Sequence, residues 1–331
     1  MFTSLMLERF TVFEHASFSW SPFINVLVGV NGTGKTHAMK VLYALQLCGH
    51  DADALAKKLV AVFRPDKGDL GRLVREHRND ARITTQWNGD QQIRVGLKPL
   101  VIEGKWRVER SPVYVPAKEM LSFAPGFIAL YDTYALPVEE VYYDILKQAC
   151  LPPRKSVPLP DADPVLDEIA QAIGGRMTLE GETFRFSRGA VDDERPAVEL
   201  GLISEGHRKL ALIGQLIVNG ALTRGGCLFW DEPEANLNPS LIGTVVSVLL
   251  KLAQRGVQIF TITHDYAFLR ELDFQKKRTE IRYFALEDEG KGVVVHPSDT
   301  YRDLAPNRIA DEYRRLYDLE IMRALGGDQE L

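Results

Sequence analysis

The chain has 331 residues, of which 45% are hydrophobic, enough to bury a large core in one big domain or two. Its formal net charge of -5 excludes a globally basic surface for nucleic acid, and its three widely spaced cysteines form neither a disulfide framework nor a zinc-binding pattern. The longest uncharged apolar run, residues 240–250, is too short to span a membrane, and the N-terminus lacks a signal-peptide pattern. We therefore expect a cytoplasmic protein without membrane insertion.

The first elements of the chain predict two strands, over residues 5–10 and 16–20, that pair in antiparallel fashion. The apolar segment of residues 24–28 predicts a buried strand, and the apolar spacing of residues 37–47 predicts a helix. Between that strand and that helix, residues 29–36 have the sequence G-V-N-G-T-G-K-T, which matches the phosphate-binding pattern G-x-x-x-x-G-K-[ST].

This loop predicts that the ligand is a nucleoside triphosphate. Its glycines let the backbone N–H groups point at the phosphates, and the N-terminus of the following helix adds a partial positive charge. We expect Lys35 to reach the β- and γ-phosphates and the Thr36 hydroxyl to hold Mg²⁺. A glycine-rich turn without a ligand is the alternative, and it is disfavoured because both of these residues are in register. The predicted loop residues that bind the nucleotide are Asn31, Gly32, Thr33, Gly34, Lys35 and Thr36.

The middle of the chain predicts strands followed by helices. Residues 83–87 and 92–97 flank an Asn-Gly turn typical of a hairpin, and residues 106–110 and 113–115 are expected to extend this β-layer beside the nucleotide. Helices are predicted over residues 138–150 and 164–173.

Residues 56–82 contain eight basic and four acidic side chains. A solvated helix face is the favoured interpretation of this segment. A surface that binds the phosphate backbone of a nucleic acid is the alternative.

In the second half of the chain, two apolar segments, a predicted helix and a predicted strand, each have polar residues at one end. Residues 202–208 precede an apolar helix that is expected to run to Leu222, with Ser204 as its N-cap. Residues 227–230 predict a buried parallel strand that ends in Asp231 and Glu232, at the edge where α/β sheets bind ligands.

The two acids have different predicted roles. We expect Asp231 to complete the Mg²⁺ shell opposite Thr36, and Glu232 to polarise the water that attacks the γ-phosphate. A pair of solvated acids at a strand end is the alternative, and the intact phosphate-binding loop disfavours it.

The last elements are a strand over residues 257–262, ending near His264, and an amphipathic helix over residues 306–325. A histidine at a strand end is more often a surface or capping residue, but here it follows the double acid by one strand. We therefore expect His264 to contact the γ-phosphate or to orient the attacking water. The helix is expected to pack on the rest of the protein, with partner docking as the less favoured use.

Taken together, these segments resemble the ABC-type ATPases. Ser204 and Gly206 form an S-x-G at a helix start that is similar to the family's signature motif, residues 233–239 resemble its D-loop, and His264 matches its switch histidine. The N-terminal sequence, from the strand of residues 5–10 through the phosphate-binding loop, is similar to the RecF/SMC-like branch, particularly to stand-alone ATPases of the OLD-like and AAA_21 kind. Glu205 and His207 depart from the usual signature but leave its serine and glycine intact.

The resemblance implies an α/β fold: an ABC-type P-loop NTPase head with a mixed central sheet, an antiparallel β-subdomain and a helical lobe. It implies a single head over residues 1–331, with an ATPase core from residues 1–48 and 198–300 and an inserted β/helical region over residues 49–197. It also implies that ATP lies between two heads, so that Ser204 and Gly206 act in trans in a homodimer or higher homo-oligomer.

The implied activity is Mg²⁺-dependent hydrolysis of ATP to ADP and phosphate, with Lys35, Glu232 and His264 as catalytic residues. Three biological roles are open at this point. The favoured role is control of a separate effector protein, in anti-phage defence. The second is a RecF-like ATPase that binds DNA during repair. The third, the nucleotide-binding subunit of a membrane transporter, is disfavoured by the N-terminal opening and by the long middle region.

Overall fold

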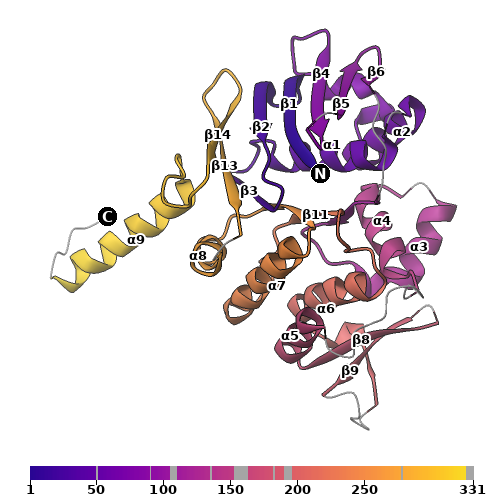
Figure 1. Cartoon of the computed structure of the whole chain (residues 1–331), viewed down its shortest axis with the longest axis vertical. Helices are drawn as coiled ribbons and strands as arrows, with labels where there is room; N and C mark the ends of the chain where they lie inside the picture. Colours follow the sequence, from indigo (N-terminus) through magenta and orange to yellow (C-terminus); the bar gives the residue numbers. More distant parts are fainter. Residues whose placement is uncertain are drawn as a thin grey trace.

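The computed structural model is built around a central sheet, with an antiparallel sheet and helices on one face and further helices on the other (Figure 1). It describes residues 1–49, 51–89, 91–104, 110–134, 136–152, 163–181, 183–189, 196–276 and 279–325. None of the helices in these ranges combines the length and hydropathy of a bilayer-spanning segment.

The central sheet is mixed, in the order β14-β13-β3-β12-β11-β7, and only β14 runs antiparallel to its neighbour. Its parallel strands are almost continuously apolar because both faces of the sheet are covered. The predicted strands over residues 24–28, 227–230 and 257–262 are thereby confirmed. The strands are β3 (Ile24–Gly29), β7 (Val113–Val115), β11 (Cys227–Asp231), β12 (Gln258–Ile262), β13 (Ile281–Asp288) and β14 (Val293–Ser298).

The second sheet is antiparallel, in the order β2-β1-β4-β5-β6, and covers one face of the central sheet. It confirms both the predicted N-terminal strand pair and the predicted hairpin. The prediction that residues 113–115 extend this layer is wrong: they form β7, which pairs in parallel with β11 of the central sheet. Residues 106–109 lie outside the described residues. The strands are β1 (Phe2–Phe10), β2 (Phe13–Ser19), β4 (Ala81–Trp87), β5 (Gln91–Leu97) and β6 (Val101–Gly104).

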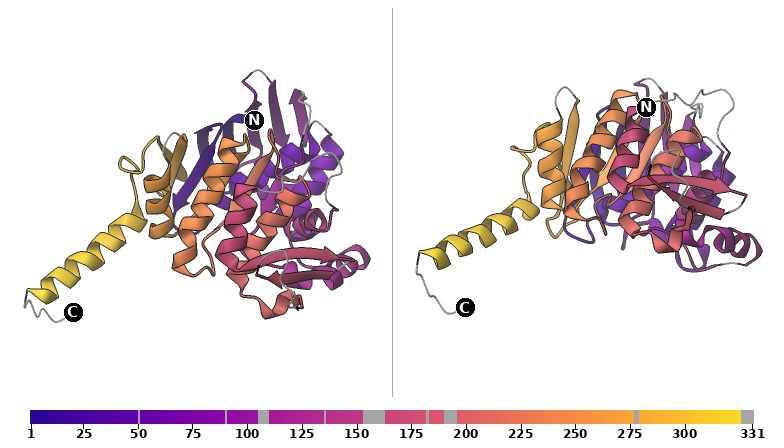
Figure 2. Two further views of the ribbon diagram at one scale, coloured as in Figure 1. Left: turned by 60° about the horizontal axis from the view of Figure 1, so that its bottom comes forward. Right: turned by 90° about the horizontal axis from the view of Figure 1, so that it is seen from below.

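Helices cover both faces of the central sheet. Helices α1 and α2 pack with the antiparallel sheet in one hydrophobic core, whereas α4 to α8 contribute to the other, together with a small sheet, β10-β9-β8 (Figure 2). Helix α6 ends four residues before the predicted Leu222. The helices of the head are α1 (Lys35–Cys48), α2 (Ala52–Phe63), α3 (Ala124–Thr133), α4 (Glu140–Ala149), α5 (Pro164–Ile173), α6 (Glu205–Val218), α7 (Ile242–Gln254) and α8 (Tyr266–Gln275). The small sheet consists of β8 (Gly175–Glu180), β9 (Thr183–Arg188) and β10 (Val198–Glu199).

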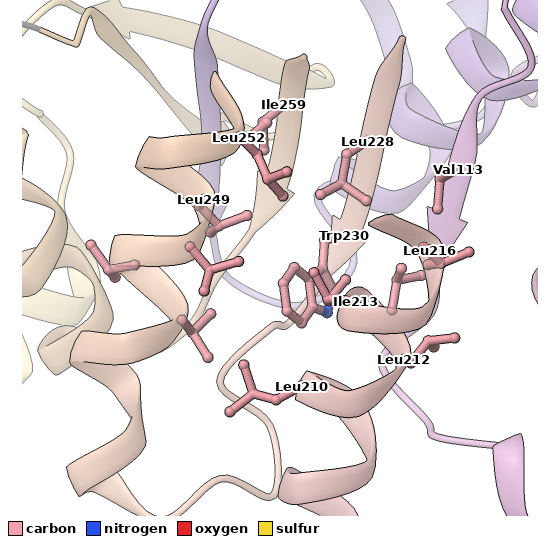
Figure 3. Close-up of a cluster of buried hydrophobic side chains, with 14 of the residues drawn as sticks. Val113, Leu210, Leu212, Ile213, Leu216, Leu228, Trp230, Leu249, Leu252 and Ile259 are labelled. Atoms are coloured by element: carbon pink, nitrogen blue, oxygen red, sulfur yellow. The ribbon is translucent and has the colours of Figure 1, made fainter. Parts of the chain in front are cut away.

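Strand β11 shows how the two cores hold the C-terminal end of a central strand in place. Phe229 points into the core shared with the antiparallel sheet, whereas Leu228 and Trp230 point toward the helices. Figure 3 shows the fully buried Trp230 ring among side chains of α6 and α7, such as Ile213 and Leu249. Because Asp231 follows Trp230 directly, the packing of this ring fixes the position of the acid at the strand end.

In the basic segment over residues 56–82 the α-helix ends at Phe63 and is followed by two short 3-10 turns and the start of β4, so the expectation of one solvated helix face is wrong beyond Phe63. Several of its cations are paired. Lys58 lies 2.7 Å from Glu140 and 2.9 Å from Asp144, both of helix α4.

The predicted C-terminal helix is present as α9 (Arg308–Ala324), but only its first turns contact the head, whereas the whole helix was expected to pack on it. It has no buried residue and points away from the other elements in Figures 1 and 2. Its contact with the head includes a stacked ring pair, Tyr266 and Tyr313, 4.5 Å apart. Tyr317 farther along the helix is 62% exposed. An amphipathic pattern predicts a helix with an apolar face, but it does not determine whether the same chain covers that face.

Candidate active site

The phosphate-binding loop lies between β3 and α1, and three of its glycines adopt left-handed backbone angles: φ is 147° at Gly29, 86° at Gly32 and 81° at Gly34. A Cβ atom on Gly29 would lie 2.4 Å from the carbonyl oxygen of Leu286. A Cβ atom on Gly34 would lie 2.6 Å from Phe13 Cζ. The chain therefore requires glycine at these positions, as expected for a backbone that curls around phosphates.

Lys35 lies near the end of this loop and is the first residue of helix α1. Its Nζ atom donates to the carbonyl oxygens of Gly29 and Val30, both at 2.8 Å. Burial lowers the pKa of Lys35 to about 8, and Asp231 and Glu232 oppose that shift. The ammonium group is therefore close to two carboxylates and is held under the loop at the position where phosphates bind in this motif.

A hydroxyl and a carboxylate meet beside the loop. Thr36 Oγ1 donates to Asp231 Oδ2 at 3.4 Å, across a sequence separation of 195 residues. Burial raises the pKa of Asp231 to about 6, with Glu232 as the next cause. A bound cation would offset the free-energy cost of burying the charged carboxylate of Asp231. Oxygen ligands such as this carboxylate and the Thr36 hydroxyl suit Mg²⁺. The donor set therefore fits the predicted metal.

Tyr114 of β7 is a further neighbour of this pair, in a strand that the sequence predicted beside the nucleotide but in the other sheet. Its hydroxyl group donates to Asp231 Oδ2 at 3.5 Å, and burial raises its pKa. The sequence marks residues 113–115 as a strand, but only the pairing of β7 with β11 places the tyrosine against the acid.

Glu232 and His264 lie side by side because β11 and β12 are neighbours in the sheet. His264 Nε2 lies 3.9 Å from Glu232 Oε1, and both side chains are partly exposed. Glu232 has a φ of 48°, and its backbone N–H donates to the carbonyl oxygen of Ile262 at 3.1 Å. Burial, followed by the charge of Lys35, lowers the pKa of His264, which favours the neutral imidazole at neutral pH. A partly exposed carboxylate next to a neutral imidazole can bind and polarise a water molecule.

The signature-like residues begin helix α6, and Ser204 is its N-cap, accepting from the His207 backbone N–H at 3.4 Å. Gly206 packs on the D-loop: a Cβ atom there would lie 2.7 Å from Leu237 Cδ2. Glu205, which departs from the usual motif, accepts from Asn236 Nδ2 at 2.8 Å. The unusual glutamate therefore ties the signature turn to the D-loop of the same chain.

The structure thus gathers five predicted site residues around one edge of the central sheet: Lys35, Thr36, Asp231, Glu232 and His264. Within the part of the chain that the structure describes, no hydrogen bond joins Ser204 or Gly206 to the loop of residues 29–36.

Part of the chain is similar in sequence to known proteins. The chain is 33% identical over 97 residues to the DNA replication and repair protein RecF of Klebsiella pneumoniae, covering 28% of the chain but only 26% of that relative. It is 30% identical over 92 residues to the L-cystine import ATP-binding protein TcyN of Bacillus subtilis, covering 27% of the chain and 32% of that relative. The matches thus span about a quarter to a third of the relatives' lengths.

Among solved structures, an SMC head bound to the C-winged helix domain of ScpA is similar with a TM-score of 0.60 at 12% identity, covering 91% of this chain and 98% of the other. This likeness confirms the predicted head fold. A family model described as "AAA domain, putative AbiEii toxin, Type IV TA system" matches residues 56–270. The chain therefore belongs to this AAA_21 family and is an ABC-type ATPase of the RecF/SMC-like branch.

Proposed function

We propose that this ATPase hydrolyses ATP in a Mg²⁺-dependent reaction at composite sites formed by two copies of the chain. The observation that carries the proposal is the cluster at the sheet edge, where Asp231 lies 3.4 Å from Thr36 and Glu232 lies 3.9 Å from His264. Lys35 supplies a positive charge to the same cluster. Thr36 and Asp231 would hold Mg²⁺, which neutralises charge on the β- and γ-phosphates when bound.

The remaining chemistry is assigned to the side chains of the chain itself. Residues 31–36 bind the phosphates, and Lys35 stabilises the negative charge of the γ-phosphoryl group. Glu232 orients a water molecule and accepts its proton as the oxygen attacks the γ-phosphorus and the bond to the leaving ADP breaks. His264 orients the same water or contacts the γ-phosphate.

The second half of the site comes from a partner copy in this proposal. Ser204 and Gly206 lie at the start of α6 and make no hydrogen bond to the described residues of their own phosphate-binding loop. A two-fold arrangement would place each signature turn over the other copy's nucleotide and form two equal sites. ATP then favours the closed dimer because it contacts both copies, and hydrolysis removes that preference.

We assign the output of this cycle to control of a separate effector protein in anti-phage defence, in the cytoplasm. The toxin named in the family description supports an effector-linked role. A RecF-like role in DNA repair is the second candidate, supported by the local similarity to RecF.

The substitution Glu232→Gln tests the mechanism directly. It keeps the shape of the side chain but removes the base, so ATP turnover should fall by about 10²–10⁴-fold while ATP still binds. Light scattering after size-exclusion chromatography should then show a dimer with ATP and a monomer without it. Glu103→Gln, an exposed change on β6, is the matched control and should behave like the wild type. Normal turnover in Glu232→Gln, or a monomer in saturating ATP, would contradict the mechanism.

The DNA-repair alternative has a separate test. If it holds, duplex DNA should stimulate turnover by the wild-type protein, and the apparent DNA affinity should fall steeply with salt because phosphate contacts release counterions. A turnover rate that does not respond to duplex DNA at low salt would remove this candidate.

A further inference from the structure

Two polar side chains, Lys209 and Glu234, tie the D-loop of residues 233–239 to its neighbours on two sides. On one side, Glu234 Oε1 accepts from Thr263 Oγ1 at 2.7 Å and from the backbone N–H of His264 at 3.1 Å. On the other side, Lys209 Nζ of helix α6 donates to the carbonyl oxygen of Ala235 at 2.7 Å and lies 3.5 Å from that of Glu232. Lys209 therefore binds the backbone of the loop, whereas Glu234, a residue of the loop itself, ties the loop to the end of β12.

The Lys209 ammonium and the Glu234 carboxylate are shielded from solvent at a cost in free energy. Lys209 is only 1% exposed, and its Nζ atom donates to backbone carbonyl oxygens. Glu234 Oε2 is buried without a hydrogen-bond partner among the described residues. Burial lowers the pKa of Lys209 and raises that of Glu234 to about 7. An apolar pair would be cheaper to bury, so packing alone does not explain these residues.

The elements that the two side chains connect carry the two halves of the proposed composite site. Lys209 lies on the first turns of α6, which begin at Ser204, and Glu234 binds the end of β12, where His264 follows. Glu232 lies between them, with its carbonyl oxygen facing Lys209 and its carboxylate facing His264.

We infer that Lys209 and Glu234 are positioning residues that form a polar bridge through the D-loop. This bridge fixes the signature turn relative to the catalytic pair Glu232 and His264 of the same chain. Its effect on catalysis rests on the proposed composite site: contact of Ser204 with the partner's nucleotide would be transmitted to the chain's own catalytic residues. The mechanical connection does not depend on that proposal, since it lies within one chain.

Hydrogen–deuterium exchange of the nucleotide-free protein tests the connection. Lys209→Met, which removes the charge but keeps an unbranched side chain, should speed exchange in the peptide around residues 261–268, on the far side of the D-loop. Glu234→Ala should speed exchange at the start of α6. Lys251→Met, which breaks a partly exposed ion pair with Glu168, should leave both peptides unchanged. If each substitution speeds exchange only on its own side of the loop, the bridge is refuted.

Single-turnover kinetics tests the effect on catalysis. Glu234→Ala and Lys209→Met should each slow the chemical step by about 10–100-fold with little change in ATP affinity, because they misplace catalytic groups without removing a phosphate contact. Glu234→Gln keeps an acceptor oxygen for Thr263 and His264 and should retain most of the rate. The double variant should be no slower than the slower single variant. Equal rates in Glu234→Gln and Glu234→Ala would overturn the positioning role.

These experiments also separate the bridge from the proposed function. A wild-type protein that does not hydrolyse ATP or dimerise with it would refute the composite site, while the exchange measurement would still decide whether the bridge exists. A wild-type protein that turns over normally, with Lys209→Met equally active, would refute the catalytic role of the bridge alone.

Discussion

The substitution Gly34→Ala is expected to destabilise the protein more than Gly32→Ala in the same loop. Both glycines have a left-handed backbone, with φ of 81° at Gly34 and 86° at Gly32. A Cβ atom on Gly34 would lie 2.6 Å from Phe13 Cζ and 2.6 Å from Val12 Cγ2, whereas one on Gly32 would meet no atom within 4 Å. Both substitutions therefore introduce backbone strain, but only Gly34→Ala adds a steric overlap, so comparing the two variants separates these contributions.

The magnitudes follow from these two contributions. Holding an alanine in the left-handed region costs about 1–3 kcal/mol at either position. Overpacking adds about 1–3 kcal/mol at Gly34, because Phe13 is fully buried and cannot move without disturbing the core between the two sheets. The free energy of unfolding should thus fall by about 1–3 kcal/mol in Gly32→Ala and by about 2–6 kcal/mol in Gly34→Ala.

Urea unfolding of the nucleotide-free proteins, followed by far-ultraviolet circular dichroism, measures this difference. Nucleotide is left out because a ligand that binds only the folded loop would add its binding free energy to the measured free energy of unfolding. The transition midpoint should fall in both variants, and further in Gly34→Ala, at an unchanged slope. Equal midpoints for the two variants would refute the steric argument.

Three further predictions concern stability. Burial lowers the pKa of His37 from 6.5 to about 4, so the unfolded chain binds a proton in that pH range that the folded protein excludes. Unfolding free energy should therefore fall by up to about 3 kcal/mol on acidification, and His37→Gln should flatten this slope in urea titrations; an unchanged slope would contradict the assignment. Arg208→Met leaves the Glu119 carboxylate, which is 0% exposed, without its ion pair at 2.5 Å. It should cost about 3–5 kcal/mol in the same assay, and a loss below about 1 kcal/mol would show that the pair is screened. Deleting residues 308–331 should cost no more than about 1.5 kcal/mol, the value of one aromatic stack, because α9 has no buried residue; a larger fall in the urea midpoint would mean that α9 supports the head.

The sequence by itself determined the phosphate-binding loop, the strand and the helix that flank it and the double acid at the end of β11. Each of these depends on a local pattern. Glycines at positions of left-handed backbone, such as Gly34, and an apolar run that ends in Asp231 and Glu232 can be recognised without knowing what packs against them. The resemblance of these motifs to a family then supplied the head fold, which the structure and the comparisons confirm.

The tertiary structure decided the features that depend on partners far apart in the chain. Tyr114 meets Asp231 across 117 residues only because β7 joins the edge of the central sheet, and nothing in a strand of three residues specifies which sheet it enters. The bridge of Lys209 and Glu234 was not predicted, because a lysine or a glutamate in sequence normally indicates an exposed side chain. Helix α9 was predicted to pack on the head, but only its first turns do so, because amphipathic spacing encodes an apolar face and does not determine which element covers it. Local patterns therefore specify the chemistry of this protein, whereas long-range packing specifies which groups hold that chemistry in place.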